Sequence, residues 1–212
     1  IEYTGFRGLA SHGAAIAVII AMYYYSKKVI KKPMLWILDR VVIPVASGAI
    51  FVRIGNFINS EIIGKEVTDF PLGVQFLKDS IGARQATIIT NIKDPSKAYD
   101  AIANDPIFAD TLASVPFRHP AQLYESFGYV FVFLTLLYFY WKTDKSKQLG
   151  FLFGLFLVLL WTVRFFVEFV KEAQVDSRGD WLLNTGQWLS IPFIIGGIYF
   201  MVQSYKKTYN SN

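Results

Sequence analysis

Five apolar stretches, each about as long as a bilayer is thick, limit this chain to one broad class of fold. A helix needs about 20 mostly apolar residues to cross a hydrocarbon core of roughly 30 Å. The stretches cover residues 9–25, 34–58, 122–141, 149–170 and 182–205. With 53% hydrophobic residues and a mean hydropathy of +0.36, the composition is too apolar for an ordinary soluble domain. The sequence predicts an all-α integral membrane protein, a polytopic bundle of about five transmembrane helices forming one domain over residues 1–212.

The connections between these stretches differ in charge at the two ends of the predicted bundle. Residues 27–32, 142–147 and 206–207 hold nine lysines and one acidic residue. Residues 61–118 and 171–180 hold eight basic and eleven acidic residues. Because lysine-rich and arginine-rich loops stay in the cytoplasm, the lysine-rich ends and the C-terminus are predicted to be cytoplasmic. The formal charge of +5 follows from this topology and gives no indication of nucleic-acid binding.

The long segment 61–118, between the second and third apolar stretches, is predicted to be a small extracytoplasmic subdomain. Its apolar side chains can form a core of their own. They are Phe70, Phe76, Ile88, Ile89 and Phe108. The β-branched run "ATIIT" at 86–90 predicts one strand. Since the first residue is Ile1 rather than Met, we expect five helices to be a minimum.

Cysteine is absent from the chain. The protein therefore has no disulfide framework and no cysteine nucleophile of its own, and any thiol in its chemistry must come from a partner. Only two histidines and no aspartate-rich pair on a predicted helix leave little to hold a divalent ion. The sequence therefore predicts chemistry with no metal and no cofactor.

The polar side chains that are costly in hydrocarbon all fall near the predicted outer ends of the helices. An arginine at the centre of a membrane helix costs about 2.5 to 3.5 kcal/mol. In chain order the polar positions are His12, residues 53–61, residues 118–125, Arg164 with Glu168, and Asn184 with Gln187. Such a convergence at one depth predicts a functional site.

Several of these residues also have a purely structural interpretation. Arg164 and Glu168 are spaced i, i+4, so they share a helix face and could simply form an ion pair. Arg53 could extend its apolar stem so that its charge reaches the interface. Gly55 and Gly64 could serve close packing rather than the approach of a ligand.

The histidine and the tyrosine–glutamate pair have structural alternatives as well. A single histidine near a helix start, such as His12, is more often an interfacial residue than a catalytic one. Tyr124 and Glu125 follow Pro120 and could be polar residues of a first helical turn, stabilised by the helix dipole. The joint pattern is a stronger indication of a site than any one of its members.

Two arginines at headgroup depth indicate an anionic ligand. The planar guanidinium group matches phosphate oxygens and stays charged, so a pair of arginines favours the binding of a phosphate. At this depth the available anion is a phospholipid headgroup. Arg53 and Arg164 are therefore the first candidates for binding a phospholipid phosphate.

The motifs that contain these residues resemble those of a known family. "RIGNFINSEIIG" at 53–64 is similar to the signature of bacterial prolipoprotein diacylglyceryl transferases, and "RHPAQLYES" at 118–126 resembles a second block of that family. Three shorter runs, in family order, resemble further blocks: "SHGA" at 11–14, "RFFVEF" at 164–169 and "TGQWLSIPFIIGG" at 185–197. Departures from the family pattern are Ser11, Ala14 and Leu160, the last where a tyrosine is usual. The family generally has seven helices, so about two would precede Ile1.

The resemblance implies an activity and a location. The family transfers the diacylglyceryl group of phosphatidylglycerol to the thiol of the lipobox cysteine of a preprolipoprotein, forming a thioether and releasing glycerol phosphate. This is the first step of bacterial lipoprotein maturation. It takes place in the bacterial cytoplasmic (inner) membrane, with the active site toward the outer (periplasmic) face and the bilayer as a further partner. The substrate peptide would then supply the thiol that this chain lacks.

The resemblance also implies roles for individual residues. His12 matches the histidine of the His-Gly block and is the first candidate for the base that takes the thiol proton, with His119 as the second. Arg53 and Arg164 are expected to stabilise the charge that develops on the leaving phosphate. The residues expected to bind or orient the substrate are Arg53, Asn56, Asn59, Glu61, Gly64, His119, Tyr124, Glu125 and Glu168.

Two other classes of function remain open from the sequence. A membrane transporter also places polar residues in helices, but near the bilayer midplane and often in repeated halves. Another enzyme that processes phospholipid headgroups would use a histidine nucleophile or a metal. A water-filled path across the membrane would favour the first class, and metal dependence or phosphate release would favour the second.

Overall fold

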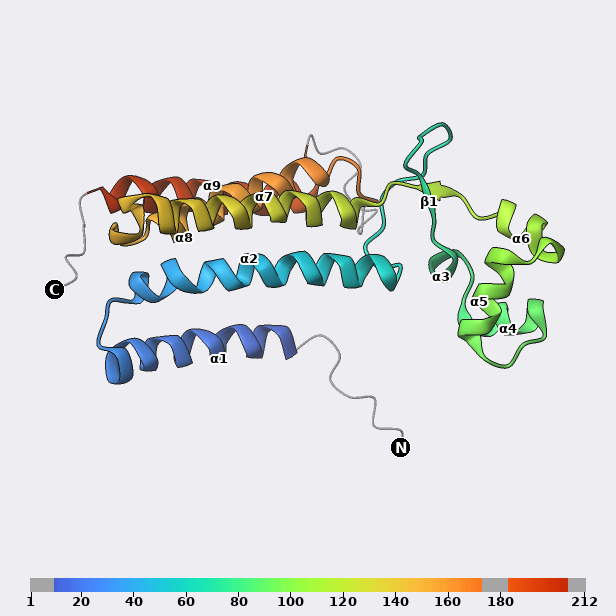
Figure 1. Ribbon diagram of the computed structural model, residues 1–212, viewed down its shortest axis with the longest axis horizontal. Coiled ribbons are helices and arrows are strands. Elements are labelled where there is room, and N and C mark those ends of the chain that lie inside the picture. Colours follow the sequence, from blue (N-terminus) through green and yellow to red (C-terminus); the bar gives the residue numbers. More distant parts are fainter. Residues whose placement is uncertain (1–9, 173–182, 206–212) are drawn as a thin grey trace.

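The computed structural model describes residues 10–172 and 183–205, and of residues 10–12, 14 and 15 it describes only the backbone. The protein is a bundle of long helices with a small helical insertion at one end (Figure 1). In chain order the elements are α1 (Ala10–Tyr24), the π-helical turn η1 (Tyr25–Ile30), α2 (Met34–Ile58), β1 (Val74–Gln75), α3 (Leu77–Ser80), α4 (Ala83–Thr90), α5 (Pro95–Asn104), η2 (Pro106–Phe108), α6 (Ala109–Ala113), β2 (Phe117–Arg118), α7 (Ala121–Lys142), η3 (Asp144–Lys147), α8 (Phe151–Val167) and α9 (Thr185–Ser204).

Each of the five apolar stretches contains one of the long helices α1, α2, α7, α8 and α9, so the prediction of a helical bundle is confirmed. Within the described residues, α2, α7 and α9 are long and apolar enough to cross a membrane, whereas α8 has 17 residues. This pattern is typical of a multi-pass membrane protein. That all five helices cross the membrane stays a prediction.

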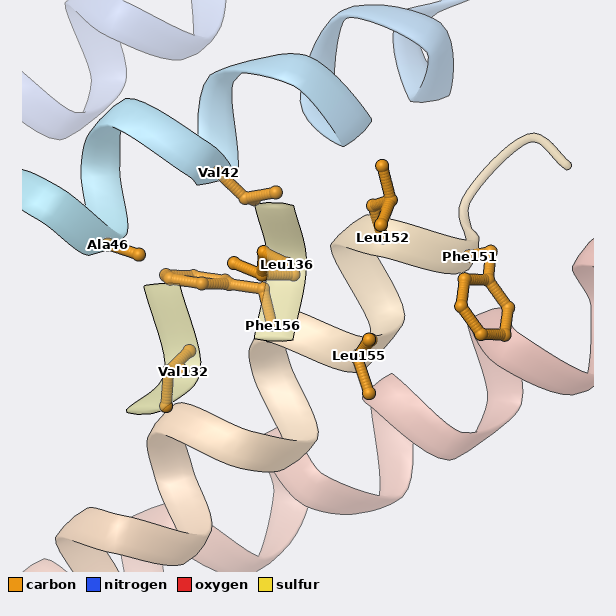
Figure 2. Close-up of a cluster of buried hydrophobic side chains, with 8 residues drawn as sticks. All are labelled: Val42, Ala46, Val132, Leu136, Phe151, Leu152, Leu155 and Phe156. Atoms are coloured by element: carbon orange, nitrogen blue, oxygen red, sulfur yellow. The ribbon is translucent and has the colours of Figure 1, made fainter. Parts of the chain in front are cut away.

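Helices α2, α7 and α8 enclose the main hydrophobic core of the bundle. Val42 and Ala46 of α2, Leu136 of α7, and Leu152 and Phe156 of α8 point toward one another (Figure 2). Helix α9 covers the other side of α8, and α1 lies beyond α2 (Figure 1). These contacts fix how the ends of α2, α7 and α8 next to the insertion lie relative to one another.

Glycines allow α8 and α9 to approach closely. A Cβ atom added at Gly154 would lie 2.6 Å from the carbonyl oxygen of Gly197, and one added at Gly197 would lie 2.6 Å from the carbonyl oxygen of Gly154. Small residues at such a crossing let two membrane helices make backbone contact.

A buried carboxylate joins α2 to the start of α8 at the end of the bundle that carries the lysine-rich connections. The Asp39 side chain is 1% exposed, and its two oxygens accept hydrogen bonds from the backbone N–H groups of Gly150 (2.6 Å) and Phe153 (2.8 Å). The first N–H groups of a helix lack partners within the helix. Asp39 supplies them from a neighbouring helix, where a negative charge also interacts favourably with the helix dipole.

Replacing Asp39 by alanine is therefore expected to lower the free energy of unfolding by about 2 kcal/mol, because two buried N–H groups lose their acceptor. Asp39→Asn keeps one acceptor oxygen and is expected to lose less. Thermal unfolding of the purified variants in detergent measures both effects. Equal stability of Asp39→Ala and the parent would show that this contact contributes nothing.

The insertion between α2 and α7 is helical and has a core of its own, formed by Ile81, Ala86, Ala98, Ile102 and Val115. The strand predicted at 86–90 is wrong, because these residues belong to α4. In a strand, residues 86, 88 and 90 would share one face. Ala86 is fully buried in this core whereas Ile88 is 70% exposed, so helical packing of Ala86 outweighs the β-branched propensity of the run.

A small irregular sheet closes the end of the bundle that carries the insertion. Strands β1 and β2 pair antiparallel, and the Val67 N–H donates to the Phe117 carbonyl oxygen at 2.8 Å. On the other side, the Lys65 N–H donates to the carbonyl oxygen of Val170 at 2.8 Å, next to a bridge between Gly64 and Lys171. The chain after α8 therefore leaves the helix to join this sheet, which explains why α8 ends before the predicted residue 170.

Candidate functional site

A cavity of about 410 Å³ lies at the end of the bundle that carries the insertion, where α2 and α8 end beside the small sheet. Arg53 from α2 and Arg164 from α8 both line it, although 111 positions separate them in the sequence. The other lining residues are Ile62, Ile63, Asp79, Glu168, Lys171 and Glu172. The fold thus brings the two arginines selected from the sequence to the same cavity.

Glu125 holds two cations at the base of this cavity. Its side chain is fully buried in the first turns of α7, with one oxygen 2.6 Å from Nε of Arg53 and the other 2.8 Å from Nζ of Lys171. The side chains of Arg53 and Lys171 are 13% and 7% exposed. A buried carboxylate between two cations is far less costly than any of the three charges alone. Glu125 therefore fixes the Arg53 side chain in the cavity wall.

The amide of Asn56 continues this network along the end of α2. Nη1 of Arg53 donates to Oδ1 of Asn56 at 3.4 Å, and Nδ2 of Asn56 donates to the Glu61 carboxylate at 2.8 Å. The backbone carbonyl of Glu61 accepts from the buried Gln122 amide at 2.6 Å. Asn59 ends α2, with an exposed side chain outside the cavity lining.

Arg164 and Glu168 do not form the ion pair that their spacing allows. Within the described residues, Glu168 pairs instead with Lys171, with Oε2 3.6 Å from Nζ. Nε of Arg164 is buried and, among the described residues, has no hydrogen-bond partner. The Arg164 guanidinium carbon lies 5.2 Å from the ring centroid of Trp161, a contact that requires none of its N–H groups.

Charges of both signs line the cavity. Within the described part of the chain, the lining holds three cations and three carboxylates, which are Arg53, Arg164, Lys171, Asp79, Glu168 and Glu172. Glu172 also pairs at 2.9 Å with Arg118, which lies outside the lining. Among the described residues no group of three histidine, cysteine, aspartate or glutamate side chains could hold a metal ion. The two guanidinium groups in this lining carry the planar N–H donors that suit an anion with several oxygens, such as a phosphate.

Gly64 lies in the small sheet rather than in the cavity lining. A Cβ atom at this position would lie 2.5 Å from both Cβ and the carbonyl oxygen of His119 and 2.9 Å from the carbonyl oxygen of Val170. The close approach that Gly64 permits is therefore between segments of the protein itself. This favours the packing interpretation of the glycine over direct contact with a ligand.

Gly64→Ala is accordingly expected to cost about 1 to 3 kcal/mol of stability, because backbone atoms must move to admit the methyl group. A matched control is Gly82→Ala, since nothing lies within 4 Å of a Cβ atom at Gly82. Unfolding temperatures of the two variants compare the sites. Similar temperatures for both would refute this explanation.

His119 and Tyr124 lie on the other side of this segment. Nδ1 of His119 is 3.3 Å from the Tyr124 hydroxyl, and its ring packs on Phe70 with centroids 4.6 Å apart. His119 lines a second, open cavity together with residues 66–70, 113 and 115–117. His12 belongs to α1, but its side chain lies outside the described residues.

Sequence reasoning missed two buried residues of the network, Lys171 and Gln122. Lys171 falls in the segment 171–180, which the sequence predicts to be an outer loop. Lys171 is three residues after Glu168 and seven after Arg164, a spacing that on a continuing helix would place all three on one face. This spacing is the signal in the sequence that indicates Lys171 as a member of the site. Gln122 was noted only as part of a sequence block, and no spacing indicates its contact with Glu61, 61 positions earlier.

Comparison with known proteins identifies the same family, and the match covers most of the chain. The family model for prolipoprotein diacylglyceryl transferase matches residues 3–203. The chain is similar to proteins named phosphatidylglycerol–prolipoprotein diacylglyceryl transferase. The relative in Bacteroides fragilis is 38% identical over 200 residues, which cover 94% of this chain and 59% of the relative. The relative in Tolumonas auensis is 39% identical over 200 residues, which cover 94% of this chain and 64% of the relative. The relative in Chloroherpeton thalassium is 36% identical over 202 residues, 94% of this chain and 62% of its own.

The chain therefore spans about 59 to 64% of the length of these relatives. A family match over residues 3–203, together with the two arginines of the family-like blocks in one cavity, leads to one conclusion. The chain belongs to the prolipoprotein diacylglyceryl transferase family.

Proposed function

We propose that this protein transfers the diacylglyceryl group of phosphatidylglycerol to the thiol of a lipobox cysteine in a preprolipoprotein. The observation that carries the proposal is the cavity in which Arg53 and Arg164 meet. The names of the relatives support both substrates. The charged groups gather at one end of the bundle and not midway along it, an arrangement that does not favour a transporter.

The reaction is a displacement at the glycerol carbon that carries the phosphate. The cysteine sulfur forms a bond to this carbon while the bond from carbon to the phosphate oxygen breaks, and the electron pair leaves with glycerol phosphate. Negative charge therefore grows on the phosphate in the transition state. Fixed cations beside that charge lower the barrier, and Glu125 holds Arg53 in place before the substrate arrives.

The thiol proton must go to a base, because a thiol with a pKa near 8.5 is mostly protonated at neutral pH. We assign this role to His12, on the basis of the His-Gly block. For His119 we propose a role in positioning, because its ring faces Phe70 and Tyr124 in the second cavity. Asn56 and Glu61 support Arg53 from the side away from Glu125.

The activity is tested with the purified full-length protein, phosphatidylglycerol vesicles and a lipobox peptide, with the products analysed by mass spectrometry. We expect the peptide to gain the mass of a diacylglyceryl group on its cysteine, with release of glycerol phosphate, and to do so in the presence of a chelator. Vesicles of phosphatidylethanolamine and a peptide with serine in place of cysteine are the controls. A folded protein that modifies no peptide with phosphatidylglycerol would overturn the proposal.

The proposed orientation places the cavity on the outer (periplasmic) side of the bacterial cytoplasmic membrane and the C-terminus in the cytoplasm. The lysine-rich connections and the described C-terminal end lie at the end of the bundle opposite the insertion (Figure 1). The positive-inside rule then assigns this end to the cytoplasm.

The absence of native cysteine allows a direct test of this orientation with single cysteines. Ser96→Cys in the insertion is expected to react with a membrane-impermeant maleimide in intact spheroplasts. Lys142→Cys at the end of α7 is expected to react only after the membrane is permeabilised. Both positions are exposed in the structure, so burial does not explain a difference. The reverse pattern of labelling would contradict the orientation.

A further inference from the structure

The arrangement of charges around Arg164 is not the one that its own helix favours. Arg164 and Glu168 are four residues apart, the spacing at which an arginine and a glutamate normally pair. The carboxylate of Glu168 is instead 3.6 Å from Nζ of Lys171, and Nε of Arg164 has no hydrogen-bond partner among the described residues. Something must hold Glu168 away from Arg164.

Lys171 is fixed at a point from which it contacts two carboxylates, those of Glu125 and Glu168. Its ammonium group donates to Glu125 at 2.8 Å and lies 3.6 Å from Glu168. Its backbone belongs to the small sheet, through the bridge to Gly64, and not to α8. The lysine therefore keeps its position independently of the helix that carries Arg164.

Helix α9 provides space for the displaced carboxylate. A Cβ atom added at Gly186 would collide with the carboxylate of Glu168, so only glycine admits the side chain in this position. Gly186 lies in the first turn of α9, whose positive dipole end favours an anion. Nδ2 of Asn184 also donates to the backbone carbonyl of Glu168 at 3.1 Å, which ties the end of α8 to this turn.

We infer that Lys171 is a positioning residue that draws the Glu168 carboxylate away from Arg164 and so keeps Arg164 available for the phosphate of the substrate. The inference rests on the proposed function in one respect, because it takes the anion of the cavity to be the phosphate of a phospholipid. Without Lys171, the partly buried Glu168 carboxylate needs another partner, and Arg164 is one turn away on the same helix. Glu168 would then compete with the phosphate.

The test measures two quantities for the full-length protein: binding of glycerol phosphate by calorimetry, and the KM and kcat of transfer from phosphatidylglycerol. Lys171→Met is expected to weaken glycerol phosphate binding by about tenfold or more, within the range of coupling between charges in one network. KM should rise more than kcat falls. Lys171→Arg should bind glycerol phosphate much more tightly than Lys171→Met, because arginine retains the positive charge.

The decisive variant is Lys171→Met combined with Glu168→Gln. If Glu168 pairs with Arg164 in Lys171→Met, removing the charge of Glu168 should recover most of the lost binding, whereas a purely structural loss would not be repaired.

Gly186→Ala gives the same test with Lys171 intact. The added methyl group should push the Glu168 carboxylate out of its position and weaken glycerol phosphate binding, and adding Glu168→Gln should relieve this effect. Lys65→Met, at an exposed lysine of the same sheet, is the matched control and should bind as the parent does.

The inference is overturned if the double variant binds no better than Lys171→Met, or if Lys171→Met folds and binds glycerol phosphate like the parent. It is also overturned if the parent does not bind glycerol phosphate at all. A parent that binds glycerol phosphate but transfers nothing to the peptide would instead contradict the proposed function, and the binding measurements would still decide the role of Lys171.

Discussion

Arg53→Ala is expected to reduce kcat/KM for diacylglyceryl transfer by about 100-fold or more, the usual effect of losing a fixed electrostatic donor. The guanidinium group lines the cavity, and Glu125 and Asn56 hold it in one orientation. The variant removes both the charge and the donors that the leaving phosphate needs. The rate of mass gain on a lipobox peptide, measured at several concentrations of phosphatidylglycerol, gives the ratio.

Two further arginine variants separate a local effect from a general one. Arg53→Lys keeps the charge but loses the planar fork, so its activity should lie between those of the parent and Arg53→Ala. Arg40→Ala removes an arginine from the opposite end of the same helix, where the guanidinium group stacks on Trp36, and should leave transfer unchanged. Activity of a folded Arg53→Ala protein within a few-fold of the parent would exclude Arg53 from the reaction.

Glu125→Leu is expected to destabilise the protein by about 3 to 5 kcal/mol, because it leaves the cations of Arg53 and Lys171 partly buried without their shared carboxylate. Glu125→Gln retains two polar atoms and the volume of the side chain, so its loss should be smaller. Thermal unfolding of the purified proteins in detergent, with and without glycerol phosphate, gives the comparison. Glycerol phosphate should stabilise Glu125→Leu, because it supplies the missing anion.

An unfolding temperature of Glu125→Leu equal to that of the parent would contradict this account of Glu125. That result would remove the basis for treating the carboxylate as the fixed partner of Arg53. A drop of the same size in Glu125→Gln would assign the whole loss to the charge, because glutamine keeps the volume and the polar atoms of the side chain.

Hydropathy predicted the helical part of the fold because a backbone segment buried in hydrocarbon must satisfy its own hydrogen bonds, and a helix does this within one segment. Within the described residues each apolar stretch contains a helix, and Arg53 and Arg164 share a cavity, as their common depth indicated. Depth along a helix can be read from the sequence, since each residue advances the helix axis by 1.5 Å. Two charges at one depth on neighbouring helices can therefore be expected to meet.

Contacts that depend on the path of the chain outside the helices could not be predicted. Lys171 enters the cavity because the chain leaves α8 and joins the small sheet, and its role follows from that backbone path. Ala86 is buried because α4 packs on α5, a tertiary contact that local β propensity at 86–90 does not register. The same holds for His119, whose backbone is in the sheet and which lines the second cavity instead of the cavity of the two arginines.

The central claim is that the phosphate of the lipid binds between Arg53 and Arg164. The most direct test is an experimental structure of the full-length protein in nanodiscs of phosphatidylglycerol. The account predicts headgroup density in the cavity, with phosphate oxygens within hydrogen-bond distance of both guanidinium groups and Glu168 still beside Lys171. A phosphate bound elsewhere, such as in the second cavity next to His119, with Arg164 paired to Glu168, would contradict it.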